Sequence, residues 1–132
     1  MTREQKRASL VYDRVNRYEN DEHTRGDYGS MAHRFPALLR SAGLIQALAF
    51  VESRGNEAHR QFIYDFASVL TELGGAKQSE KAASTYGSLF EKAREADLPE
   101  YLRMTREALA VADWFKRFAQ SVLKVAPGRT EP

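Results

Sequence analysis

The spacing of apolar residues along the chain predicts helices and no strands. Apolar side chains recur every three to four residues in about six successive segments, which is typical of helices that bury one face. No segment shows the strict alternation of a half-buried strand, and the sequence contains neither an internal repeat nor a low-complexity tract. We therefore expect an all-α, single-domain bundle of about six helices joined by short loops.

Capping residues indicate where these helices begin and end. Thr2 followed by Gln5 forms a capping-box pattern, and Asp97 before Pro99 marks the start of the last helix. The predicted helices run from Thr2 to about Asn20, from about Asp27 to Ala42, from Leu44 to about Ser53, from Asn56 to about Gly74, from Ser79 to beyond Ala93, and from Asp97 to about Lys124.

The stretch RFPALLRSAGLIQALAF, residues 34–50, predicts the centre of the core. Pro36 lacks a backbone donor and clashes with the preceding turn, so we expect a proline-interrupted second helix. Gly43 can end that helix and admit a sharp turn into the next one. The run at residues 44–51 is apolar around almost its whole circumference, which is typical of a buried helix.

Composition narrows the class of protein. The 132 residues are enough for one core, so we place a single helical domain at residues 1–126 and a flexible C-terminal tail at 127–132. The absence of cysteine excludes disulfides and cysteine-based metal sites, and it agrees with the cytoplasmic location that we expect. The charged N-terminus lacks a signal-peptide pattern, and no apolar run approaches the ~20 residues of a membrane span.

Basic residues form two rows when the first and last helices are drawn as wheels. Each row falls within an arc of roughly 60–80° and can follow a phosphate backbone without reading bases. An ordinary solvated face is the alternative for each row, because the net charge is only +2. The opposite, buried side of the last helix is expected to include Leu98 and Leu102. The rows consist of Arg3, Arg7, Arg14 and Arg17 on the first helix and Arg103, Arg106, Arg117 and Lys124 on the last.

Two aromatic residues are candidates for a protein interface. Trp114 lies beside the basic row of the last helix, and Tyr12 points away from the basic row of the first. Tryptophan is enriched among the residues that dominate binding energy at interfaces. Packing at the edge of the bundle is the alternative for both.

Candidate catalytic chemistry is sparse. The three histidines are scattered, and no metal-binding or phosphate-loop motif is present, so no metal site is expected. Arg54 and His59 match the spacing of the Arg–His signature of HEPN ribonucleases, in which such a pair would assist phosphate chemistry. Gly55 and Asn56 between them indicate a loop and a helix cap, a poor setting for that motif.

Four segments resemble a known family. They are residues 34–39 (RFPALL), 43–50 (GLIQALAF), 101–109 (YLRMTREAL) and 114–119 (WFKRFA). Their order and spacing resemble the small, fifth-numbered helical subunit of the type III-B CRISPR effector, the Cmr complex. The resemblance covers most of the chain, from the first helix to about Lys124.

The resemblance implies a non-catalytic structural subunit in antiviral defence. Such a protein would stack with copies of itself beside a filament of larger repeat subunits that carry the guide RNA, and would need no cofactor, metal, membrane or small-molecule substrate. By position in the motifs, Arg34, Lys116 and Arg117 are the first candidates for contact with the guide–target RNA backbone. The next candidates are Arg103, Arg106, Lys124, Arg7, Arg14 and Arg17. A HEPN-type ribonuclease and a helical adaptor that binds only protein remain as alternatives.

Overall fold

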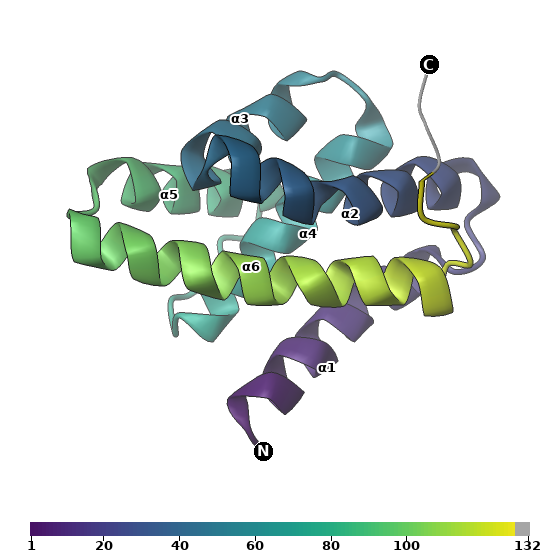
Figure 1. The fold of residues 1–132 in the computed structure, drawn as a ribbon, viewed down its shortest axis with the longest axis horizontal. Coiled ribbons are helices and arrows are strands. Elements are labelled where there is room, and N and C mark those ends of the chain that lie inside the picture. The colour runs from purple at the N-terminus through teal and green to yellow at the C-terminus, as the bar shows by residue number, and fades with distance from the viewer. Residues whose placement is uncertain (129–132) are drawn as a thin grey trace.

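The computed structural model describes residues 1–128 and confirms an all-α fold; within these residues there is no strand (Figure 1). The last four residues of the predicted tail, 129–132, lie outside the described residues. The elements are α1 (Arg3–Val15), the 3-10 turn η1 (Asn16–Tyr18), α2 (Glu22–Ala42), α3 (Leu44–Ser53), α4 (Glu57–Leu73), α5 (Ala82–Glu95) and α6 (Leu98–Ser121).

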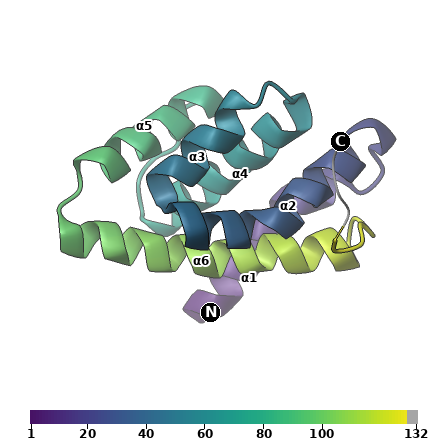
Figure 2. The ribbon, with the colours of Figure 1, turned by 45° about the horizontal axis from the view of Figure 1, so that its top comes forward.

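Helices α2 and α6 lie side by side and form the most extensive contact between two elements. Figure 2 shows α6 along the lower side of the molecule, with α2 next to it and α3, α4 and α5 beyond, and in Figure 1 α6 crosses the front of the molecule with α1 extending below it. Helix α1 crosses α6 and also packs on α4. The exposed residues of α6 lie toward its two ends, within 98–106 and 116–121, and no residue between these segments is exposed.

The centre of the core is a cluster of phenylalanines from three helices. Phe35 of α2, Phe62 and Phe66 of α4 and Phe115 of α6 are all completely buried. The rings of Phe35 and Phe66 meet edge to face with centroids 4.8 Å apart, and those of Phe62 and Phe115 do so at 5.2 Å. Aromatic pairs of this geometry contribute about 0.5–1.5 kcal/mol each beyond the burial of their area. The cluster therefore fixes how α2, α4 and α6 sit against one another.

The turn at Gly43 is as predicted, whereas α2 begins earlier than expected. Gly43 has φ 86°, a value that favours glycine, and its N–H donates to the Leu39 carbonyl at 3.0 Å. Helix α2 begins at Glu22 instead of about residue 27, because the Asp21 carboxylate caps it by accepting from the Thr24 N–H at 3.2 Å. The assigned helix continues through the buried Pro36.

The placement of two leucines in the core was wrong. Leu98 and Leu102 are 68% and 47% exposed. They lie roughly 80° and 120° around α6 from the middle of its buried stripe, so the predicted apolar side was too broad. The buried stripe consists of Ala108, Val111, Ala112, Phe115 and Ala119. Among residues 1–128, no helix has the length and hydropathy of a membrane span.

Candidate interaction surfaces

The arginines of α1 are engaged with carboxylates of the same chain. Arg14 is only 8% exposed, and its guanidinium donates to the Ser68 hydroxyl at 2.9 Å and to Glu72 at 3.1 Å. Both partners lie on α4, so this ion pair joins α1 to the centre of the bundle. A guanidinium held in this way has little capacity left for a phosphate.

Arg3 and Arg7 converge on one carboxylate of α6. Arg3 contacts Glu107 at 2.7 Å, and Arg7 contacts the other oxygen of Glu107. Burial alone would raise the pKa of Glu107, but the hydrogen bonds from Arg7 and Arg3 outweigh it and hold that pKa below its usual range. The pKa of Arg7 is raised by the same contact. The three charges therefore fasten α1 to α6.

Arg17 lies beside a buried carboxylate at the end of η1. Its guanidinium is 4.0 Å from Asp65, which also accepts hydrogen bonds from Tyr28 at 2.7 Å and from Tyr18 at 3.1 Å. Burial raises the pKa of Asp65, although these hydrogen bonds oppose it. Burial also raises the pKa of both tyrosines, which keeps their hydroxyls protonated as donors.

Most basic residues on α6 and directly after it differ from the arginines of α1, because within residues 1–128 they have no carboxylate partner. Arg106, Lys116, Arg117 and Lys124 are exposed, and within residues 1–128 none of them is paired with a carboxylate. Arg106 and Arg117 lie on the side of α6 away from the phenylalanine core, and Lys116 lies roughly 100° around the helix from Phe115. The prediction that Lys124 belongs to the helical row was wrong, because α6 ends at Ser121 and Lys124 follows it with φ 60°. Arg103 differs, because it pairs with Glu100. We call Arg106, Lys116, Arg117 and Lys124 the α6 basic surface.

Arg34 is exposed on α2, at the end of the molecule where α6 terminates. Its neighbour His33 donates from Nε2 to the carbonyl of Val125, at 2.7 Å, in the segment that follows α6. Helices α2 and α6 are antiparallel, since Gly29 lies against Val125 whereas a Cβ added at Gly43 would lie 3.6 Å from the Tyr101 hydroxyl. Arg34 is thus at the same end of the molecule as Lys124.

The structure brings Tyr12 and Trp114 into one aromatic cluster through Phe118. Tyr12 meets the Phe118 ring edge to face at 5.5 Å, and Trp114 stacks on the same ring at 5.4 Å. The guanidinium of Arg117 lies 5.6 Å above the Trp114 ring, and the indole N–H donates to Glu4. Sequence reasoning missed Phe118, although its spacing of four residues from Trp114 places both on one helical face.

Arg54 and His59 do come together, with Arg54 exposed and His59 buried. Arg54 Nε donates to His59 Nδ1 at 3.2 Å, and the Asn56 side chain caps α4 by accepting from the His59 N–H at 3.1 Å. His59 is completely buried, so its ring is not accessible to a substrate in this conformation. Among the described residues, no group of three or more potential ligands could hold a metal ion.

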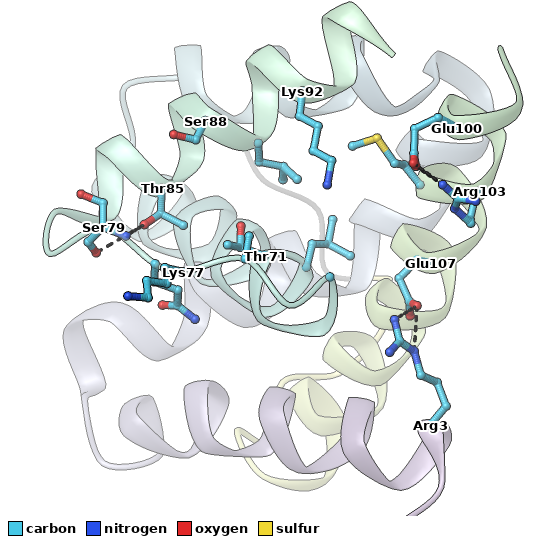
Figure 3. A pocket seen from close by; sticks show the side chains of 16 residues that line it. Arg3, Thr71, Lys77, Ser79, Thr85, Ser88, Lys92, Glu100, Arg103 and Glu107 are labelled. Carbon is cyan, nitrogen blue, oxygen red and sulfur yellow. Dashed lines mark hydrogen bonds and ion pairs between the residues drawn. The ribbon is translucent and has the colours of Figure 1, made fainter. Parts of the chain in front are cut away.

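A pocket of about 410 Å³ opens between the end of α4 with the loop that follows it, α5, α6 and the start of α1 (Figure 3). Its apolar lining comes from Leu70, Leu89 and Met104. Lys92 points into it from α5, and Lys77 lies at its edge in the loop (Figure 3). Within residues 1–128 neither lysine is paired with a carboxylate. No pattern in the sequence indicates this pocket, because its walls come from four separate segments.

Comparison with known proteins decides the family. A family model described as "CRISPR-associated protein (Cas_Cmr5)" matches residues 3–122. The chain belongs to the Cmr5 family. It is 47% identical over 123 residues to the "CRISPR system Cmr subunit Cmr5" of Thermus thermophilus, a match that covers 93% of this chain and 97% of that protein.

A solved Cmr5-family structure has the same fold. The crystal structure of a CRISPR-associated Cmr5 family protein from Thermus thermophilus superposes with a TM-score of 0.76 at 45% identity, over 93% of this chain and 98% of the other. The resemblance seen in the sequence motifs is therefore confirmed. All four motif segments lie within the part of the chain that matches the Cmr5 family model.

Proposed function

We propose that this Cmr5-family chain is a non-catalytic structural subunit of a type III-B Cmr effector complex. It would stack beside the filament of repeat subunits, next to further copies of itself, and support the guide–target RNA duplex through its basic surface. Membership of the Cmr5 family supports the placement in a Cmr complex, because the Thermus relative is named as a Cmr subunit. The burial of His59 supports a role without ribonuclease chemistry.

The proposed RNA contact rests on a difference between the basic residues of α1 and those of α6. Arg3, Arg7 and Arg14 are occupied by Glu107, Glu72 and Ser68. The α6 basic surface has no such partners within residues 1–128 and is exposed. A cation that is not already neutralised gains more from a phosphate, since counterions leave the nucleic acid when it binds. We therefore propose that Lys116, Arg117 and their neighbours in the α6 basic surface contact RNA, and Arg34 remains a candidate by its position in the family motif alone.

The aromatic cluster supports a protein contact next to this surface. Trp114 and Tyr12 share the ring of Phe118, and Tyr12 is 43% exposed. Arg117 belongs to both features, because it stacks on Trp114 and lies on the α6 basic surface. A partner that covers the cluster would sit directly beside the RNA contact, which suits a subunit docked against a guide-carrying filament.

The test is charge reversal within the assembled complex. Arg106→Glu with Lys116→Glu should leave assembly intact, because neither residue belongs to the aromatic cluster, and should weaken capture of target RNA and lower the slope of log affinity against log salt by about one per lost phosphate contact. The matched control is Lys6→Glu with Lys81→Glu, which changes the net charge equally at exposed sites away from α6. Equal capture and equal slopes for the two variants would show that α6 does not contact RNA.

A separate measurement tests the structural role. Purified chain should not cleave RNA, and removing it from the complex should reduce the stability of the assembly while the cleavage chemistry of the remaining subunits persists. Cleavage by the purified chain that is lost in His59→Ala would instead establish the ribonuclease alternative.

A further inference from the structure

Two leucines at the beginning of α6 have no packing partner that covers them. Leu98 is 68% exposed and Leu102 is 47% exposed, and no other leucine among the described residues is an exposed side chain. Because they are four residues apart, they project from the same face of the helix, one turn from each other. Exposed acidic residues, Glu95 and Asp97, lie directly before them in the chain. The result is an apolar projection with negative charge at its base.

The pocket described above has the complementary chemistry. Leu70 and Leu89 are buried beneath it, and Met104 contributes a flexible apolar wall. Lys77 and Lys92 supply positive charge without a carboxylate partner within residues 1–128. No aromatic side chain lines the pocket, so it lacks the stacking surface that binds nucleic-acid bases. An aliphatic side chain accompanied by carboxylates fits it best.

The projection and the pocket lie on opposite sides of one helix. Arg103, Met104 and Glu107 line the pocket, and on a helical wheel their side of α6 is roughly 170° from Leu98 and Leu102. A chain therefore cannot fill its own pocket with its own leucines. A neighbouring copy can, and each copy would then present an unused projection to the next.

We propose that Leu98 and Leu102 of one copy insert into the Leu70–Leu89–Met104 pocket of the next copy. Glu95 and Asp97 then face Lys77 and Lys92 across the contact. This inference rests on the stacking in the proposed function and specifies the surfaces that make it. Because different patches of each subunit meet, the contact is heterologous and continues as a row instead of closing as a dimer.

The absence of cysteine from the sequence allows the contact to be trapped as a disulfide within the assembled complex. One chain carries Ser88→Cys at the pocket, the other carries Leu98→Cys, and the two are assembled together and oxidised mildly. The matched control replaces Leu98→Cys with Gln120→Cys, an exposed position on the same side of α6 but near its other end. The Ser88–Leu98 pairing should give several-fold more cross-linked heterodimer than the control.

Reversing one charge on each side of the contact gives a second test of the proposed pairing. Lys92→Glu on the Ser88→Cys chain should lower the yield several-fold, and Glu95→Lys on the Leu98→Cys chain should restore it. Asp97 is left unchanged because its carboxylate caps α6 by accepting from the Glu100 N–H at 3.0 Å. A return of the cross-linking yield after the second reversal is expected only if Glu95 of one copy faces Lys92 of the next.

The outcomes separate this inference from the proposed function. The proposed contact would be overturned if Leu98→Cys and Gln120→Cys gave equal cross-linking yields with Ser88→Cys, or if the main product were the Ser88–Ser88 dimer. In either case, if the complex still contains its usual copies of the chain, the subunit role remains intact. Failure of the wild-type chain to enter the complex would overturn the subunit role and this contact with it.

Discussion

A single added methyl group at Gly29 tests how the segment after α6 closes the fold. Gly29 lies inside α2, and an alanine Cβ there would be 2.6 Å from Val125 Cγ2 and 2.8 Å from Val125 Cβ. Val125 cannot simply turn away, because its N–H donates to the Ala119 carbonyl at 3.0 Å and its carbonyl accepts from His33 at 2.7 Å. The short branched side chain offers no flexible end that could move aside.

The magnitude follows from two opposing effects. Alanine in place of glycine inside a helix gains about 1 kcal/mol. Displacing Val125, which is 6% exposed, gives up its burial at a cost of about 1.5–3 kcal/mol. Gly29→Ala should therefore lower the free energy of unfolding by about 0.5–2 kcal/mol.

The assay is urea unfolding followed by circular dichroism, with Gly87→Ala as the matched control. Gly87 lies inside α5 and is exposed, and no atom lies within 4 Å of the added Cβ, so this variant should be more stable than wild type by about 0.5–1 kcal/mol. Val125→Ala should remove the clash, so Gly29→Ala should cost much less in that background. If Gly29→Ala were stabilised as much as Gly87→Ala, the packing of Val125 on α2 would be refuted.

Three further predictions concern the core and the buried charges. Phe62→Ala should lower the free energy of unfolding by about 3–5 kcal/mol in the same urea assay, because its completely buried ring meets four other rings; a loss below about 1 kcal/mol would contradict the core assignment. Glu107→Gln should lose stability at neutral pH, and since the folded pKa of Glu107 lies below its unfolded value, its difference from wild type should shrink as pH falls through that folded pKa. For Asp65→Asn the pH dependence of the stability difference should have the opposite sign, because burial raises the folded pKa of Asp65. Wild type should lose stability relative to this variant as pH rises from the unfolded pKa through the folded pKa. Unfolding curves between about pH 3.5 and pH 7 measure both, and parallel profiles for wild type and variants would contradict them.

The sequence by itself determined the class of fold and most of its boundaries. Helical periodicity, the Thr2 capping box and the Gly43 turn are local features, since each depends on residues within a turn or two of chain. The family motifs were also readable, because they are continuous segments. The early start of α2 was the main boundary error, and it arose from the Asp21 cap, which is a local signal that the sequence reading passed over.

The tertiary structure alone decided which charges and apolar residues are available at the surface. Periodicity gives the direction of a side chain around its own helix axis, but it does not say which helix lies in that direction. Glu107, which holds Arg3, is 104 residues away, and Phe118 joins Tyr12 to Trp114 only because α1 crosses α6. The same crossing engages Arg3 and Arg7 with Glu107, and the packing of α1 on α4 engages Arg14, whereas the α6 basic surface stays exposed. The exposed leucines and the pocket likewise depend on where neighbouring helices stop, which is a property of packing over the whole domain.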